Sequence, residues 1–323
     1  MEDNFISVSS GKGHKFINIF CILLLIVIYL VTVLFNGLSG SGNSDLFNSN
    51  IGNLSDKYEL DISPAGFTFS IWSIIYTGIA LTFIFYVFTI LTKRKPGNGY
   101  RYLNPVIASP AYCIVYCINM IFNNGWIFSW DRELLVVASY VLFSIAATNA
   151  LAMTLLIRNI ERDNHLLMKE QPKTYWTYIV LAFNGHGIYC TWTVIASLLN
   201  FTHCLHYRDG LAMQTSVLVS LSMLLIILVG WAMMEMIWLD AYARFLITPY
   251  LVVIWALSGI LAKKFNDPVV SDVTKGYVLA LMVITISLLI VKISILTFRQ
   301  IRRSFVKYQT SKRPRKASLG AVN

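Results

Sequence analysis

Long apolar blocks, each close to 20 residues, dominate the sequence and restrict what it can fold into. Such a block crosses the hydrocarbon core of a bilayer as a helix, because only helices and closed barrels satisfy the backbone there. The blocks are continuously apolar instead of alternating, which excludes a barrel. The sequence therefore predicts an all-α fold, a polytopic transmembrane helix bundle of eight spans. Their approximate bounds are 16–35, 66–91, 106–128, 134–157, 176–199, 216–238, 245–261 and 276–298.

Composition and charge agree with a membrane class. Hydrophobic residues make up 56% of the 323 residues and charged residues 13%, about half the charge of a typical soluble domain. The net charge of +10 sits in loops and a tail beside the apolar blocks, where Lys and Arg set topology. We therefore expect the lipid bilayer as a partner and no nucleic acid.

Two regions follow from this pattern. Residues 1–298 form one transmembrane domain, and residues 299–323 form a basic cytosolic tail. The tail is expected to be disordered and attracted to anionic lipid. Ser318 follows the basic run and is a candidate for phosphorylation, which would weaken that attraction.

Positive charge predicts the orientation. With the amino terminus inside, the inner segments hold nineteen of the 26 Lys and Arg residues and the outer loops six. The positive-inside rule then places both termini in the cytosol. Two N-x-S/T sequons, at Asn53 and Asn200, fall in segments that this orientation places outside, and both are candidates for glycosylation.

The first apolar block has an alternative interpretation as a cleaved signal. The small residues 37–42 after it resemble a signal-peptidase site. Cleavage would leave seven spans with an external amino terminus, the topology of a seven-helix receptor. The length of the block, about twenty residues, favours an uncleaved anchor instead.

Polar residues inside an apolar helix are costly, so their positions are informative. The third block carries the richest set, repeating every three or four residues along one helix face. Such a face lines a ligand cavity, or its amides form hydrogen bonds between helices, and both interpretations stay open. The residues are Tyr112, Tyr116, Asn119, Asn123, Trp126 and Trp130.

Aromatic residues also mark the second span. This block begins just after Pro64, and a proline suits the first turn of a helix because it has no N–H to leave unpaired. Phe69, Trp72 and Tyr76 follow at helical spacing. They are candidates for ligand binding, with packing between helices as the alternative.

Two ionisable residues lie inside other blocks. His186 stands between two glycines in the fifth block, with Trp192 further along, and a lone histidine there favours a structural hydrogen bond over metal binding or titration. Glu235 lies near the inner end of the sixth block. An intramembrane carboxylate is a functional candidate, with snorkelling to the interface as the alternative.

Three segments resemble the tryptophan-rich sensory protein / translocator protein (TspO/MBR) family. The stretch PAGFTFSIWSIIY at 64–76 resembles the start of that family's second helix, although Phe69 lies one residue closer to the tryptophan than in the family's pattern. Asn123 with Trp126 resembles its Asn-x-x-Trp, and Pro249-Tyr250-Leu251 with Trp255 resembles its Pro-Tyr-Leu-x-Trp with altered spacing. The chain as a whole is similar to an animal family of longer multi-pass proteins related to that one. The first resemblance implies a helical bundle that binds a tetrapyrrole or sterol in an aromatic pocket. That family has five spans, whereas eight are expected here.

The leading prediction is thus a non-enzymatic membrane protein that binds a small amphipathic or aromatic ligand, tetrapyrrole- or sterol-like, for sensing or transport. The alternative is a proton-coupled secondary transporter that uses Glu235 or His186. No cofactor or metal is expected, no paired catalytic groups are present, and the oligomeric state stays open. The sequons favour the plasma membrane or another secretory-pathway membrane over the mitochondrial location that the family resemblance suggests.

Overall fold

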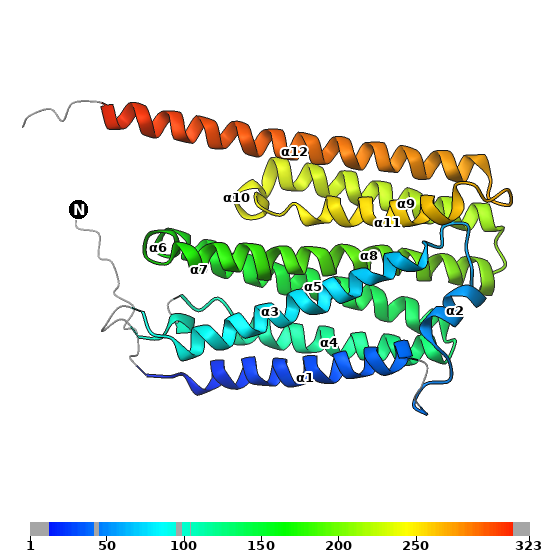
Figure 1. Ribbon diagram of the computed structural model, residues 1–323, viewed down its shortest axis with the longest axis horizontal. Coiled ribbons are helices and arrows are strands. Elements are labelled where there is room, and N and C mark those ends of the chain that lie inside the picture. Colours follow the sequence, from blue (N-terminus) through cyan, green and yellow to red (C-terminus); the bar gives the residue numbers. More distant parts are fainter. Residues whose placement is uncertain (1–12, 42–44, 95–98, 104, 313–323) are drawn as a thin grey trace, which may run out of the picture.

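The structure, a computed structural model, describes residues 13–41, 45–94, 99–103 and 105–312; residues 313–323 of the basic tail, with Ser318 among them, lie outside these ranges. Within these ranges the chain is helical, apart from one isolated β-bridge between Lys93 and Tyr100. The elements lie roughly parallel along one axis (Figure 1). The expected all-α class is therefore confirmed for the described chain.

Seven helical runs of the described chain are long and apolar enough to cross a membrane. Most of them extend past the apolar blocks, because their polar ends continue as helix beyond the hydrocarbon. The runs are α1 (Phe16–Ser41), η1 with α3 (Gly66–Leu91), α4 (Pro110–Asp131), α5 (Leu135–Arg162), the run Pro172–Arg208 of α7 (Pro172–Thr177), η3 (Tyr178–Phe183), α8 (Asn184–His203) and η4 (Cys204–Arg208), the run Met213–Trp238 of α9 (Met213–Met233) and η5 (Met234–Trp238), and Asp272–Arg302 within α12 (Asp272–Lys312).

The remaining helices are shorter. α2 (Ile51–Lys57) lies between α1 and η1, α6 (Asn164–Glu170) between α5 and α7, and α10 (Asp240–Ala243) between η5 and α11. The seventh expected span corresponds to α11 (Thr248–Lys264), which has 17 residues and packs between α8 and α12. Two single-turn 3-10 elements complete the order, η1 (Gly66–Ser70) and η2 (Arg101–Leu103).

Side-chain hydrogen bonds explain why α11 starts late. The Asn184 amide donates to the carbonyl oxygens of Ile179 and Phe245, both at 2.9 Å, and the Thr248 hydroxyl donates to the Asn184 carbonyl at 3.1 Å. The chain before Thr248 is thereby held as a turn against α8. Gly187 permits this approach, since a Cβ there would collide with Thr248.

The helices pack in an order that places α4 and α8 in the interior. α4 lies against α1 and α5, α8 lies against α5 and α11, and α11 lies against α12. α1 touches α3 at few points. In Figure 1, α1 begins and α12 ends at the same end of the bundle, and α2 lies at the opposite end. The polar stripe of α4 faces inward, since all six of its residues are buried.

A candidate ligand-binding cavity

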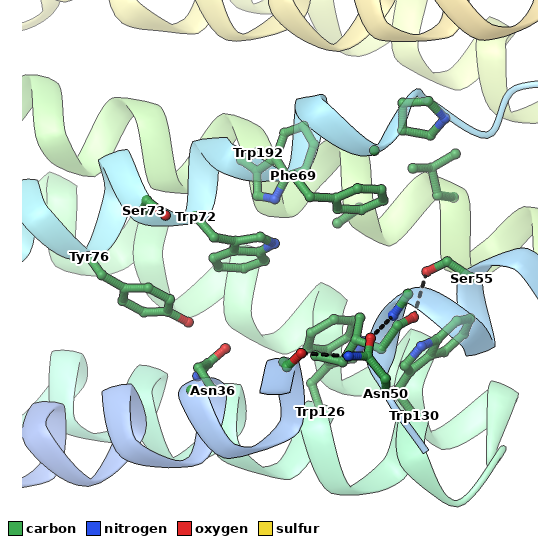
Figure 2. A pocket seen from close by; sticks show the side chains of 18 of the residues that line it. Asn36, Asn50, Ser55, Phe69, Trp72, Ser73, Tyr76, Trp126, Trp130 and Trp192 are labelled. Carbon is green, nitrogen blue, oxygen red and sulfur yellow. Dashed lines mark hydrogen bonds between the residues drawn. The ribbon is translucent and has the colours of Figure 1, made fainter. Parts of the chain in front are cut away.

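A cavity of about 870 Å³ lies at the end of the bundle that carries α2. Its walls come from α1, α2, η1 with α3, α4, α8 and the end of α11. A volume of this size accommodates a small organic molecule. The sequence predicts eleven candidate ligand-binding residues, all of which the structure describes: Phe69, Trp72, Tyr76, Tyr116, Asn119, Asn123, Trp126, His186, Trp192, Glu235 and Trp255. Five of the eleven line the cavity (Figure 2), namely Phe69, Trp72, Tyr76, Trp126 and Trp192.

A row of near-parallel aromatic rings forms one wall. The Trp72 ring is stacked with Tyr76 at a centroid distance of 5.7 Å and with Trp126 at 6.3 Å, the interplanar angles being 19° and 21°. Trp126 is stacked with Trp130 at 6.4 Å and 20°. Trp192 meets Trp72 edge-on at 6.4 Å. Flat apolar surfaces in one orientation suit a flat or elongated apolar ligand.

Three of these indoles also carry unpaired polar atoms. The Nε1 atoms of Trp126, Trp130 and Trp192 are buried and make no hydrogen bond within the part of the chain that the structure describes. Buried polar groups normally have a partner. The cavity walls are therefore polar at a few points and aromatic elsewhere.

The position of Phe69 is set by the contact of η1 with α11. The Ala65 N–H donates to the Gly259 carbonyl at 3.0 Å, and the Trp255 indole donates to the Thr68 carbonyl at 2.9 Å. Gly259 has no side chain, and a Cβ there would collide with Thr68. Trp255, a predicted binding residue, thus lies behind the wall and supports it.

A hydrogen-bond network closes the inner end of the cavity. The Asn123 carbonyl oxygen accepts from the Asn36 amide at 3.0 Å and from the Tyr76 hydroxyl at 3.3 Å. Its amide donates to the Tyr189 hydroxyl at 3.1 Å. Asn123 is fully buried and supports the inner end of the cavity, which we call its floor, from outside the cavity. This network joins α1, α3, α4 and α8.

The outer end is covered by the segment that contains α2. The Asp131 carboxylate accepts from the backbone N–H groups of Asn48 at 2.8 Å and Ser49 at 3.0 Å. The His203 ring bonds the Tyr58 carbonyl at 2.9 Å. Since a carbonyl oxygen only accepts, Nε2 of His203 carries the hydrogen.

Ion pairs fix the same segment to α11 and to the turn after α4. Glu59 pairs with Lys264 at 2.8 Å and with Lys263 at 3.0 Å, and hydrogen bonds from these two lysines lower the pKa of Glu59 below its usual value. Glu133 pairs with Lys57, and hydrogen bonds from Lys57 and Tyr58 lower the pKa of Glu133. The cover is thus held by charged contacts at both edges.

A gap between α1 and α3 gives the cavity a side opening. The Tyr29 hydroxyl donates to the Tyr76 carbonyl at 2.7 Å and joins the two helices at the inner end. Ser73 and Thr77 of α3 and Gly37 of α1 line the cavity and are also exposed at the surface of the bundle. The cavity therefore opens sideways along the bundle.

Other predicted residues lie away from this cavity. The Asn119 amide donates to the Ile145 carbonyl at 2.8 Å, which joins α4 to α5 as the interhelical interpretation expects. His186 bonds the Tyr112 hydroxyl at 2.8 Å and the Asn149 oxygen at 2.6 Å, and its ring lies 4.5 Å from that of Tyr116. Both ring nitrogens of His186 are therefore used in hydrogen bonds within the bundle.

Glu235 belongs to a separate buried cluster on the last helices. Its carboxylate forms an ion pair with Lys292 of α12 at 3.2 Å and accepts a hydrogen bond from Tyr250 of α11. The Lys292 ammonium also donates to the Ala243 carbonyl at 3.1 Å. Both charged side chains are nearly inaccessible. Glu235 is paired inside the bundle, in contrast to a side chain that snorkels to the interface.

The two sequons differ in their surroundings. Asn53 is exposed on α2. Asn200 lies within α8, its side chain is buried, and its amide donates to the Ala196 carbonyl at 3.3 Å. A glycan at Asn200 would require this side chain to leave its place in the cavity wall.

Several lining residues carried no signal in the sequence. Asn36 directly follows the first apolar block, and the α2 residues were expected only as a loop. Their role depends on which helices become neighbours, so spacing within one block does not reveal it. They are Tyr29, Asn36, Gly37, Asn50, Ser55, Asp56 and Lys263.

The comparisons with known proteins agree with the sequence resemblance. A sequence model of a family described as TSPO-like protein matches residues 20–295. None of the curated proteins and none of the solved structures compared with the chain matches it. The predicted relationship to the TspO/MBR family is thereby confirmed. Since the matched residues cover most of the 323, including the described spans and the cavity, the chain belongs to the TSPO-like protein family.

Proposed function

We propose that this multi-pass membrane protein binds a small amphipathic or aromatic ligand, tetrapyrrole- or sterol-like, for sensing or transport. The observation that carries the proposal is the cavity of about 870 Å³ with its wall of near-parallel rings. Burial of a flat apolar surface against such rings contributes roughly 25 cal/mol per Å². Membership of the TSPO-like family supports the same assignment.

The side opening supports a ligand that is dissolved in the membrane. The gap between α1 and α3 is lined by small residues, Gly37, Ser73 and Thr77, which leave room for passage. The cover over the outer end is held by charged contacts, which would hinder direct entry from water. We therefore expect the ligand to partition into the bilayer first.

Tetrapyrrole titration of the purified protein tests the proposal, with quenching of tryptophan fluorescence as the measurement. The Trp72→Ala/Trp126→Ala variant removes two stacked rings and is expected to weaken binding at least tenfold, since each aromatic pair contributes about 1 kcal/mol beyond burial. Trp238→Ala is the matched control, because Trp238 is 70% exposed on η5 and does not line the cavity. Undetectable binding, or unchanged binding by the double variant, would refute the site.

We also propose eight spans, in which α11 is the seventh in chain order and adds to the seven long runs, with both termini in the cytosol. An even number of crossings agrees with α1 beginning and α12 ending at one end of the bundle (Figure 1). α11 has 17 residues, about 25 Å of helix, which reaches across most of the hydrocarbon. Retention of α1 is supported by its wall residues in the cavity and argues against a cleaved signal and a seven-helix receptor.

The plasma membrane or another secretory-pathway membrane remains the proposed location. It rests on the exposed Asn53 sequon at the end of the bundle opposite to the termini. Proton-coupled transport through Glu235 or His186 is the alternative proposal. Both residues are buried in networks that lie outside the cavity lining, so the geometry favours binding over coupling.

A further inference from the structure

The hydrogen bonds at the floor of the cavity determine what kind of polar group a ligand needs there. The Asn36 amide nitrogen donates to the Thr32 carbonyl at 2.8 Å and to the Asn123 oxygen at 3.0 Å. Both partners only accept in these contacts, so both amide hydrogens of Asn36 are used. This assigns the orientation of the amide and leaves the Asn36 carbonyl oxygen without a donor from the described part of the chain.

That oxygen faces the cavity. Figure 2 shows it on the cavity side of α1, close to the hydroxyl of Tyr76. The Tyr76 hydroxyl donates its only hydrogen to Asn123 at 3.3 Å, so its remaining capacity is also that of an acceptor. Two acceptors, from α1 and α3, therefore lie at the same floor, and neither has a hydrogen to offer.

The floor lies well below the surface of the bundle and carries no charge. Asn123, which supports it, is eight residues before the end of α4 at Asp131, or about 12 Å along the helix. Among the lining residues that the structure describes, the charged ones are Asp56 on α2 and Lys263 near the end of α11, both at the outer end. An ammonium group would have no counter-ion at the floor, whereas a neutral hydroxyl needs none.

We propose that the cavity selects a neutral amphiphile with a hydroxyl group at its buried end, and that the Asn36 oxygen and the Tyr76 hydroxyl accept its hydrogen bond. The inference rests on the proposed ligand-binding function and adds the chemistry of the ligand and a recognition residue, Asn36. An acceptor left unpaired in an apolar site costs free energy, so a molecule without the donor binds less tightly.

Two probes that differ only in this donor test the inference: 1-pyrenebutanol and its methyl ether. Each is titrated into the purified full-length protein, and energy transfer from tryptophan to pyrene measures binding. The alcohol is expected to bind about five- to tenfold more tightly than the ether, as one hydrogen bond predicts. Equal affinities would overturn the inference and leave ligand binding intact, whereas no binding of either probe would overturn the proposed function itself.

Two variants assign the preference to the floor. Asn36→Leu keeps the branched shape of the side chain and removes its carbonyl oxygen, so its alcohol-to-ether ratio should fall to about one. Tyr76→Phe should lower the ratio partially. Asn124→Leu is the matched control, because Asn124 is a neighbouring amide on α4 outside the cavity lining, and its ratio should equal that of the wild type. A wild-type ratio in Asn36→Leu would overturn the assignment of Asn36. Thermal unfolding of each variant verifies that it is folded. The alcohol-to-ether affinity ratio of the wild-type protein tests, without any variant, whether the ligand needs a hydroxyl donor.

Discussion

At the scale of single residues, the bundle keeps two charges inside it by pairing them. Glu235 and Lys292 are 0% and 3% exposed, and their ion pair joins η5 to α12, with Tyr250 of α11 bonded to the same carboxylate. Burial of an unpaired charge is far more costly than burial of a bonded pair. The pair therefore makes the last three long helices depend on one another.

Loss of one partner should cost more than loss of both. Lys292→Met leaves the carboxylate with Tyr250 alone, and we expect destabilisation of about 3 kcal/mol. Lys292→Met/Glu235→Leu replaces the pair by apolar groups and should recover most of that stability. Unfolding in detergent, followed by circular dichroism, measures both. A single variant as stable as the wild type would show that the pair contributes nothing.

The residues of the polar stripe on α4 show what a sequence pattern can and cannot predict. Their inward direction follows from spacing along one helix, and the structure buries all six. Their separate roles do not follow. Asn119 and Asn123 are one turn apart, yet one bonds α5 and the other bonds α1, α3 and α8. The role of each asparagine depends on which helix lies beside it, and the sequence of one apolar block does not show which helices will pack against it.

At the scale of elements, prediction succeeded where a local signal ends a helix. Pro64 marks the start of the second span, and its predicted bounds of 66–91 match Gly66–Leu91. The start of α11 was placed three residues early, because the turn before Thr248 is held by Asn184, 64 residues away in the chain. α2 was expected as a loop, although it covers the cavity, since a helix of seven residues leaves little periodicity to detect.

The contacts of α2 predict how the cover responds to acid. Glu59 and Glu133 have lowered pKa values in the folded state, each because of hydrogen bonds from partners that include lysines. Their stabilising effect is therefore present above the ordinary carboxyl pKa and is lost as the pH falls through the lowered values. Hydrogen exchange of residues 51–63 should stay slow from pH 7 down to the ordinary carboxyl pKa, and protection should be lost as the pH falls through the lowered pKa values of the two glutamates.

Matched variants separate this effect from general acid unfolding. Glu59→Gln/Glu133→Gln should loosen the same segment at pH 7, where the rest of the bundle is unaffected. Asp163→Asn is the control, since Asp163 pairs with Arg162 at 2.9 Å after α5, in a segment apart from α2. Equal protection of residues 51–63 in the double variant and the wild type would contradict the role of the ion pairs.

At the scale of the whole molecule, the eight crossings that we propose tie the location of α2 to that of the termini. If both termini are cytosolic, α2 and the cover lie on the outer side. Asn53 is then the accessible sequon, whereas Asn200 is buried in the cavity wall. The proposed orientation therefore predicts glycosylation at Asn53, so one experiment tests both.

Expression in mammalian cells checks it. The protein should shift to lower apparent mass after treatment with an N-glycosidase, and Asn53→Gln should abolish the shift, because its side chain is exposed on α2. Asn200→Gln should leave the shift unchanged, because the Asn200 side chain is 6% exposed. A shift that persists in Asn53→Gln and disappears in Asn200→Gln would contradict the packing of α8. An absent shift in the wild type, together with external labelling of the carboxyl terminus, would reverse the orientation.

The row of indoles along the cavity wall also has an optical consequence. Trp72, Trp126 and Trp130 are stacked at 6.3 and 6.4 Å with interplanar angles of 21° and 20°. At such spacing the electronic transitions of neighbouring rings couple, so the three absorb and emit as a set with a characteristic near-ultraviolet dichroism. A molecule that enters beside them changes that coupling. The near-ultraviolet dichroism of these three indoles should therefore report whether the cavity is occupied, which allows candidate ligands to be compared without any label.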